Sequence, residues 1–179
     1  MAFFDLPSDE ELTPEVRQTL EEYRRLIGAE QVPVGWRAFA RSPKIIQARF
    51  TGFYNFFHQC RFPWQVKNLA LMLIAHAKRC QVCFSGSRSE LNKLGWDEPT
   101  LDRICTNPES LPLKGPDRAF VQYAVQLATD PAQAKLKDFK EMEAAGLSKD
   151  EILETIAFAA YWNEHMTYTL SQVGWLAEE

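Results

Sequence analysis

The stretch "FPWQVKNLALMLIAHAKRCQVC", residues 62–83, decides the fold of this chain and contains its candidate chemistry. It is apolar on most of its circumference after Pro63, which is typical of a helix buried on several sides. A single helix over 63–94 would have about 32 residues, far more than the usual mean of about 11–12. The fully apolar pattern stops at "AKRC", residues 77–80. We therefore expect a break there and a second helix that begins at Cys80.

Helix start and stop signals recur along the rest of the chain, and no segment shows the period-2 alternation of a strand. Thr13, Pro14 and Gly28 supply the N-cap, the first position and the stop of one helix. Ser148 and Glu151 form a capping box for the last helix. Other helices are expected over 43–59, 115–129 and 131–146, and residues 106–116 form the clear non-helical connector.

These patterns predict an all-α fold, a compact multi-helix bundle. With 179 residues the chain is about one domain long. No linker-like composition and no charge block divides it. We expect an acidic N-terminal helical extension over residues 1–30 and one helical domain over residues 31–179.

Composition restricts the partners and the location. Hydrophobic residues make up 46% and charged residues 25%, with a formal net charge of −4 and no basic tract, which argues against nucleic-acid binding. The start "MAFFDLPSDEEL" lacks the basic and long apolar regions of a signal peptide. The apolar runs "LALMLIA" and "IAFAAYW" are too short to span a bilayer. We expect a cytoplasmic protein with no membrane or nucleic-acid partner.

The chain has four cysteines, Cys60, Cys80, Cys83 and Cys105, too few for a disulfide-stapled secreted scaffold. In a reducing compartment a C-x-x-C is more typical of redox, catalytic or metal chemistry. A helix start at Cys80 would favour thiolate, as would the neighbouring Lys78 and Arg79. One sulfur could then attack the substrate, and the other could resolve the resulting sulfenic acid or mixed disulfide. We predict a reversible Cys80–Cys83 disulfide, with at least one of the two pKa values below about 8.5, and reduced Cys60 and Cys105.

Two other interpretations of the pair stay open at this point. The cysteines could be small residues packed on one helix face. They could also belong to a structural zinc site, but such a site needs four ligands. His58, Cys60 and Cys105 show no second C-x-x-C and no H-x-x-x-H. We expect no metal and no cofactor.

The segment "QVKNLALMLIAHAKRCQVCFSGSRSELNKLGWD" resembles the core motif of the alkylhydroperoxidase D-like branch of the carboxymuconolactone decarboxylase superfamily. Its flanks, "VPVGWRAFARSPKIIQARFTGFYNFF" and the helical half from Asp117 to Leu170, resemble peroxidase-related members. The resemblance covers about residues 31–175. It implies an all-helical alkylhydroperoxidase D-like bundle, a helix break before the first cysteine, and assembly into homo-oligomers.

The resemblance also implies a proton relay that this sequence has altered. The family places a glutamate twelve residues before the first cysteine and a histidine four after the second; here these positions are Asn68 and Ser87. Neither side chain can take up a proton near pH 7. His76, one turn before Cys80, is the candidate substitute base, with a packing role as the alternative.

The leading hypothesis is a thiol-dependent hydroperoxide or disulfide reductase of the antioxidant type, made slow by the altered relay. Cys80 and Cys83 would be the catalytic pair, with a small hydroperoxide or disulfide as substrate and a thiol as reductant. The alternatives are a carboxymuconolactone decarboxylase-like lyase and a non-catalytic oligomeric or sensor protein. The decarboxylase branch does not depend on a C-x-x-C, so the cysteine pair favours the reductase.

Overall fold

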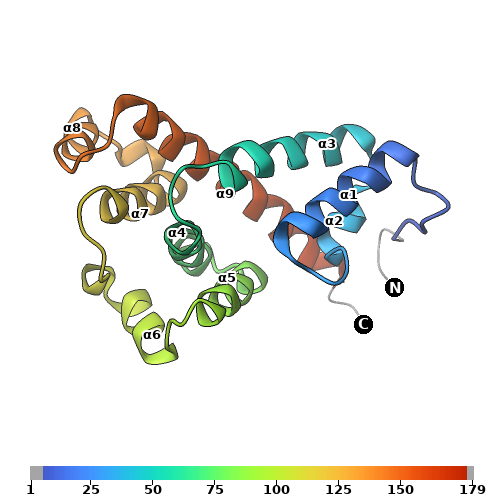
Figure 1. Cartoon of the computed structure of the whole chain (residues 1–179), viewed down its shortest axis with the longest axis horizontal. Helices are drawn as coiled ribbons and strands as arrows, with labels where there is room; N and C mark the ends of the chain where they lie inside the picture. Colours follow the sequence, from blue (N-terminus) through green and yellow to red (C-terminus); the bar gives the residue numbers. More distant parts are fainter. Residues whose placement is uncertain (1–5, 177–179) are drawn as a thin grey trace. The chain divides into compact units, whose positions relative to one another are not determined.

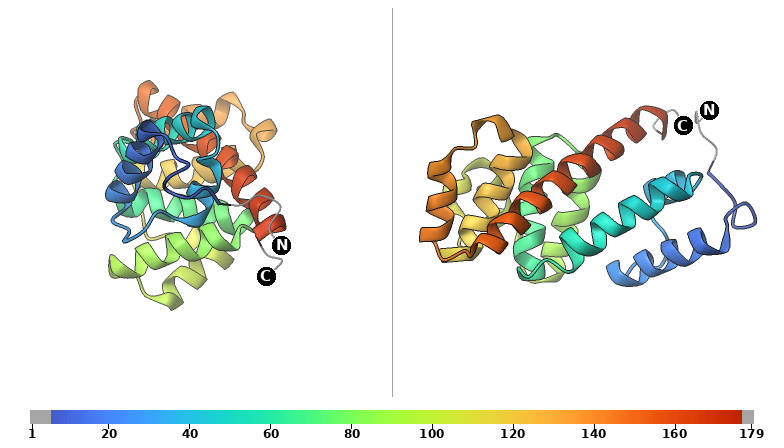
Figure 2. Two further views of the ribbon diagram at one scale, coloured as in Figure 1. Left: turned by 90° about the vertical axis from the view of Figure 1, so that its right-hand side faces the viewer. Right: turned by 90° about the horizontal axis from the view of Figure 1, so that it is seen from above.

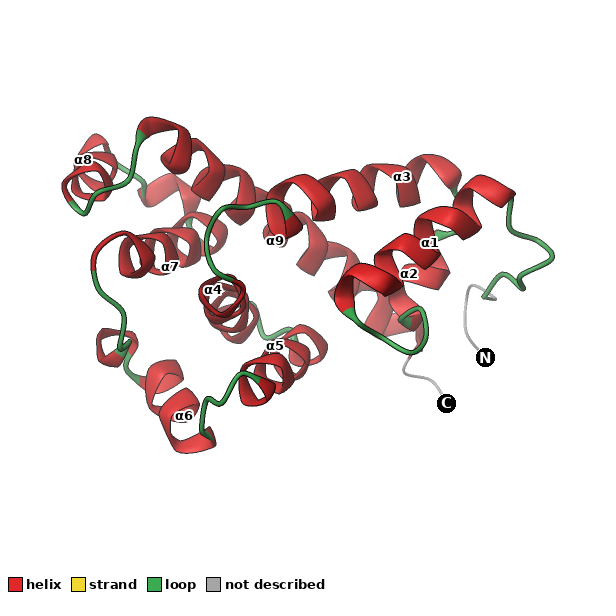
Figure 3. Cartoon of the chain, viewed as in Figure 1, coloured by secondary structure: helices red, strands yellow, loops and turns green. Residues whose placement is uncertain are grey.

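The computed structural model describes residues 6–176, with side chains up to Ser171. Over this part of the chain it contains nine α-helices, one π-helix and two short 3₁₀-helices, and no strand (Figure 3). The predicted all-α fold is therefore confirmed. The chain forms two compact units, one of residues 1–59 with 168–179 and one of residues 60–167. The expected division into an N-terminal extension that ends at residue 30 and a helical domain that begins at residue 31 stays a prediction.

The first unit contains α1 (Pro14–Ile27), α2 (Val34–Phe39), α3 (Pro43–Gly52) and the π-helix η1 (Phe53–His58). The Thr13 hydroxyl accepts a hydrogen bond from the N–H of Val16 at 3.3 Å, and Gly28 ends α1 with a φ of 66°. The predicted limits of this helix are confirmed. α1 lies alongside α3 (Figure 2), where the Gln47 side-chain amide donates to Thr19 Oγ1 at 2.8 Å.

Aromatic side chains form the core of the first unit. Tyr23 stacks on Trp36 with ring centroids 3.6 Å apart, and Phe53 meets Tyr23 edge-on at 4.8 Å. The helix expected over 43–59 is present, but its last turns are π-helical, with the N–H of Gln59 donating to the Tyr54 carbonyl five residues back. This wider turn was not foreseen, because an apolar repeat near 3.6 does not distinguish the two helix types over so few residues.

In the second unit α4 (Trp64–Ala77) is the central helix, and it contacts α5 (Gln81–Lys93) and α7 (Gly115–Thr129) (Figure 1). Every residue from Val66 to Ala75 is buried, as the apolar circumference predicted. Behind α4, Phe62 stacks on Phe120 at 3.9 Å, and Phe120 meets Phe158 edge-on at 5.0 Å. These ring contacts join the segment just before α4 to α7 and to residue 158 near the C-terminus.

The remaining helices of this unit are α6 (Glu98–Thr106), α8 (Leu136–Ala144) and α9 (Lys149–Leu176), which continues into the first unit. The predicted capping box is present: Ser148 N–H donates to Glu151, and Glu151 N–H donates to Ser148 Oγ at 3.3 Å. The helix expected over 131–146 was placed too early. A 3₁₀ turn at Pro131–Gln133 precedes α8, because the Asp138 carboxylate accepts from the Lys135 N–H at 2.8 Å and starts the helix there.

None of the helices in residues 6–176 is both long and apolar enough to cross a membrane.

Candidate active site

The break between α4 and α5 lies where the sequence predicted it. Arg79 connects the two helices with a φ of 58°, a left-handed conformation in which glycine is usual. Its N–H donates to the His76 carbonyl at 3.1 Å, and the Cys80 N–H donates to the Ala75 carbonyl at 2.9 Å. These bonds cap the end of α4. They also make Cys80 the N-cap of α5 and put Cys83 in its first turn.

We expect Arg79→Gly to stabilise the protein. A non-glycine residue in the left-handed region carries a steric cost of about 1–2 kcal/mol, and glycine offsets part of the gain through its greater freedom in the unfolded chain. The free energy of unfolding in urea should rise by roughly 0.5–1 kcal/mol. Lys78→Gly, at a residue with ordinary right-handed angles, should lower it and serves as the control.

The two thiols of the pair touch. Cys80 Sγ and Cys83 Sγ lie 2.7 Å apart in hydrogen-bonding contact, and both cysteines are in the reduced form. Cys80 is fully buried, whereas Cys83 is half-buried and is the sulfur of the pair with more access to solvent. Disulfide closure needs little movement, because both sulfurs already occupy one face of the helix start.

The contact changes the acidity of the pair. The pKa of Cys80 is lowered to about 7, first by the hydrogen bond with the Cys83 thiol and then by the backbone N–H groups of Cys83 and Val82, while burial opposes the shift. This agrees with the sequence expectation that one thiol would titrate below its ordinary value. The charges of Lys78 and Arg79 are not among the causes, so the helix start and the partner thiol account for the shift.

The rate of alkylation of the pair should rise with pH around pH 7 and level off before pH 8.5, whereas Cys60 and Cys105 should react only at higher pH. The thiolate form of Cys80 is favoured by the fold, so its stabilising effect is complete above the ordinary thiol pKa and is lost as the pH falls through about 7. Alkylation quenched at fixed times and followed by peptide mass spectrometry measures the rate at each cysteine as a function of pH. A midpoint near 9 for both Cys80 and Cys83 would contradict the shift.

A cavity of about 510 Å³ opens beside the break. Three neighbouring segments line it: the end of α4 with the connector, the start of α5, and α6. The lining residues are Ala75, His76, Arg79, Cys80, Gln81, Phe84, Arg88, Asp102, Cys105 and Thr106. Of the pair, the buried Cys80 lines the cavity, whereas the less buried Cys83 is in contact with Cys80 and is not a lining residue.

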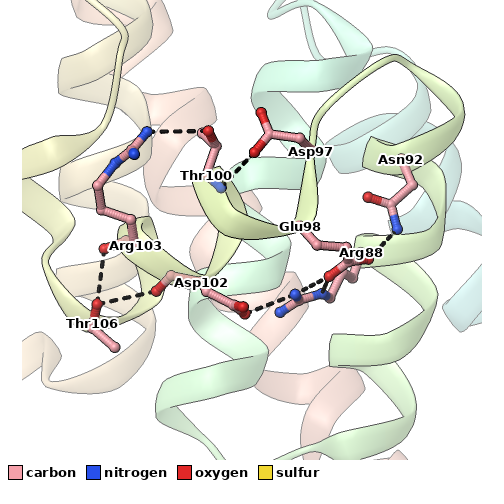
Figure 4. Close-up of polar contacts among 8 residues, drawn as sticks. All are labelled: Arg88, Asn92, Asp97, Glu98, Thr100, Asp102, Arg103 and Thr106. Carbon is pink, nitrogen blue, oxygen red and sulfur yellow. Dashed lines mark hydrogen bonds and ion pairs between the residues drawn. The ribbon is translucent and has the colours of Figure 1, made fainter.

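An ion-pair cluster joins α5 to α6 at the wall of this cavity (Figure 4). The Arg88 guanidinium pairs with Glu98 and, at 2.7 Å, with Asp102. The Asn92 amide donates to the same Glu98 carboxylate, and Asp97 caps α6 by accepting from the Thr100 N–H at 2.8 Å. Arg88 is therefore neutralised within the protein.

The two altered relay positions are buried and bonded within their own helices. The Asn68 amide donates to the Trp64 carbonyl at 2.9 Å. Ser87 Oγ donates to the carbonyls of Cys83 and Phe84 at 2.8 and 3.2 Å. Neither residue lines the cavity. The third candidate, His76, does line it: its ring is exposed, lies 5.6 Å from the Phe84 ring and makes no hydrogen bond within residues 6–176.

The other two cysteines differ from the pair. Burial raises the pKa of both Cys60 and Cys105. Cys60 is buried in the second unit, where Lys67 donates to its carbonyl at 3.1 Å. Cys105 lines the cavity, which the sequence did not indicate, because only the packing of α6 against α5 brings residue 105 near residue 80. Within residues 6–176, no group of three or more His, Cys, Asp and Glu side chains could hold a metal ion.

This arrangement of helices, with a C-x-x-C at the helix start after a central buried helix, is an alkylhydroperoxidase D-like fold. Among solved structures the chain is similar to two uncharacterized peroxidase-related proteins. The one from Ralstonia eutropha JMP134, described as an alkylhydroperoxidase AhpD core, matches with a TM-score of 0.80 and 15% identity over 95% of this chain and 89% of that one. The one from Silicibacter sp. TM1040 matches with a TM-score of 0.79 and 15% identity over 96% and 90%.

A third similar structure is the debrominase Bmp8, solved as a cysteine-to-alanine variant in complex with 2,3,4-tribromopyrrole. It matches with a TM-score of 0.76 and 15% identity over 96% of this chain and 91% of that one. No protein-family model matches the chain. No curated protein matches it by sequence. At these identities the likeness shows the fold alone.

Proposed function

We propose that the protein is a thiol-dependent reductase of small hydroperoxides or disulfides, with Cys80 and Cys83 as its catalytic pair. The observation that carries the proposal is the contact of two reduced sulfurs at 2.7 Å, with the pKa of Cys80 lowered to about 7, beside a cavity. A thiolate is the nucleophilic form of cysteine, and a second thiol within reach allows the first to be regenerated.

Solvent access indicates which of the two cysteines attacks the substrate and which one resolves. Cys83 is the less buried of the two residues, so we assign the attack to Cys83 and resolution to the buried Cys80, which connects Cys83 to the cavity through their contact. Once the pair has lost one proton, the remaining proton can lie on either sulfur, so the thiolate forms at Cys83 when Cys80 holds the proton.

With a hydroperoxide, the Cys83 thiolate attacks the terminal oxygen and breaks the O–O bond. The alcohol leaves after taking up one proton, and Cys83 becomes a sulfenic acid. Cys80 sulfur then attacks Cys83 sulfur and releases water, which closes the disulfide. The peroxide gains two electrons and the pair loses two. An external dithiol reduces the disulfide by exchange and restores the pair.

Protons for the leaving alcohol must come from a group other than residues 68 and 87. We propose His76, the imidazole in the cavity wall, which can act through a bound water. His76→Phe keeps a ring against Phe84 but removes the nitrogens, so it should lower peroxide turnover by roughly tenfold, below the range of a directly bonded acid–base. His165→Phe, at an imidazole outside the cavity lining, is the control. Equal rates for wild type and His76→Phe would leave His76 with a packing role only.

The decisive experiment is the consumption of hydrogen peroxide and of a small alkyl hydroperoxide with dithiothreitol as the donor. Turnover above the buffer rate, with a Cys80–Cys83 disulfide detected when the donor is omitted, supports the reductase. Turnover of a muconolactone without peroxide consumption would favour the decarboxylase-like lyase. If neither occurs, the oligomeric or sensor protein is the better description.

The likeness to Bmp8 supports a second candidate, removal of bromine from a small aromatic ring. The cavity has two aromatic side chains, His76 and Phe84, that could flank such a ring. The reaction balances if the pair supplies two electrons: the ring exchanges bromide for hydrogen, and Cys80 and Cys83 become a disulfide. Release of bromide from tribromopyrrole in the presence of a dithiol tests it.

We also propose that the chain assembles as a homo-oligomer in the cytoplasm. Within the second unit, α9 exposes Leu153 to 63% and Ile156 to 36%, so part of an apolar helix face is uncovered in the single chain. Sedimentation at micromolar concentration measures the assembly. A stable monomer would contradict this proposal.

A further inference from the structure

The charged residues around the cavity differ in whether they are paired. Two arginines line it, Arg79 and Arg88, with one carboxylate, Asp102. Arg88 is paired with Asp102 and with Glu98, so its charge is compensated (Figure 4). Arg79 has neither an ion pair nor a side-chain hydrogen bond anywhere in residues 6–176. Arg79 is therefore the exposed and unpaired cation of the cavity wall.

The backbone at Arg79 adds a second, independent observation. The connector needs a left-handed residue here, and the φ of 58° is one that glycine adopts without strain. Strained residues persist where the surrounding structure over-determines their conformation, and they concentrate at functional sites. Arg79 is exposed, directly precedes Cys80 and is one of the residues that line the cavity.

The rest of the wall favours a flat, apolar group. The His76 and Phe84 rings lie 5.6 Å apart, and Ala75 adds to the apolar lining. A volume of about 510 Å³ suits a small aromatic molecule better than a polymer. Guanidinium groups bind carboxylates with two parallel hydrogen bonds, which also orients the bound molecule.

We infer that the cavity selects an anionic aromatic substrate, whose carboxylate pairs with Arg79 while its ring lies against Phe84 and His76. This inference names the substrate class for the proposed reductase and rests on it for the chemical step. With an aromatic disulfide, a thiolate of the pair attacks one substrate sulfur and releases one aryl thiolate. The second cysteine then closes the Cys80–Cys83 disulfide and releases the other.

The test compares two aromatic disulfides, the dianionic dithiobis(nitrobenzoate) and the neutral dithiodipyridine. Cys105→Ser serves as the background, because Cys105 lines the same cavity and its thiol would add to the signal. Rates of aryl thiol release are measured under pseudo-first-order conditions, and mass spectrometry confirms that Cys80 and Cys83 are the residues joined.

Arg79→Gly should lower the ratio of the anionic to the neutral rate by roughly 1.5-fold to fivefold, the range for one exposed ion pair. Both rates are measured on the same cysteine pair, so a change in the reactivity of the thiols cancels when the anionic rate is divided by the neutral rate. Arg79→Lys should retain most of the ratio, because it keeps the charge. Lys78→Gln removes the same charge one residue away, outside the lining, and should leave the ratio unchanged. A ratio that is unaffected by Arg79→Gly, or lowered equally by Lys78→Gln, overturns the inference.

A binding measurement separates this inference from the proposed function. In the Cys80→Ser, Cys83→Ser variant, calorimetry with para-nitrobenzoate and para-nitrobenzamide reports recognition without chemistry. Tighter binding of the benzoate, lost in Arg79→Gly, supports the anion site even if the pair has no reductase activity. Equal binding of the two compounds overturns the anion site and leaves the reductase proposal standing.

Discussion

Cys83→Ser is expected to reduce peroxide consumption with a dithiol donor to the rate of the buffer, the largest effect of any substitution proposed for this chain. The half-buried Cys83 is the sulfur that meets the substrate, and a serine hydroxyl stays protonated where a thiol would ionise. The loss should therefore be complete rather than partial. It is measured by the disappearance of hydrogen peroxide at pH 7.5, close above the pKa of about 7 for Cys80.

Cys80→Ser should also stop turnover, but at a later step. Cys83 can still react once, and without a resolving thiol its sulfenic acid should accumulate and be trapped by a dione reagent. Cys60→Ser and Cys105→Ser should each retain most of the activity, since burial raises the pKa of both thiols. Continued turnover in Cys80→Ser with the dithiol would show that the external thiol resolves Cys83 and that Cys80 is dispensable.

Restoring the two relay groups is expected to produce the largest gain. The double variant Asn68→Glu, Ser87→His should raise peroxide turnover by about 10²–10⁴-fold, the contribution of a positioned general acid–base. Residue 87 already lies one turn beyond Cys83, since Ser87 Oγ reaches the Cys83 carbonyl at 2.8 Å. A histidine there can approach the Cys83 sulfur from the same face of α5.

The single variant Asn68→Glu distinguishes the effect of a proton relay from a general effect of added charge. Asn68 is buried, so Asn68→Glu alone should lower the free energy of unfolding by roughly 3–5 kcal/mol, the cost of an uncompensated buried charge. The double variant should be less destabilised than this single change, because the imidazole can pair with the carboxylate. Urea unfolding measures both. If the double variant folds normally and gains no activity, residues 68 and 87 do not carry the proton relay of the family. That result would favour a non-catalytic role for the protein.

Local sequence signals determined both ends of α1 and the start of α9. Thr13 and Gly28, and the capping box of Ser148 and Glu151, act through hydrogen bonds to residues three or four positions away, so the sequence alone contains both partners. The same holds for the break before Cys80, where an over-long apolar helix had to end. Both sulfurs of the pair are three residues apart on one helix start, and their contact could therefore be predicted.

The cavity was decided by tertiary structure. Asp102 and Cys105 reach it because the ion pairs of Arg88 join α6 to α5, and ion pairs between helices leave no periodic signal in a sequence. The packing also decided which basic residue matters. Lys78 and Arg79 look equivalent in the sequence, but the left-handed turn directs only Arg79 into the cavity wall. Likewise, the sequence identified which relay groups are absent, whereas only the fold shows that Asn68 and Ser87 are buried against their own helices and that His76 is the imidazole facing the site.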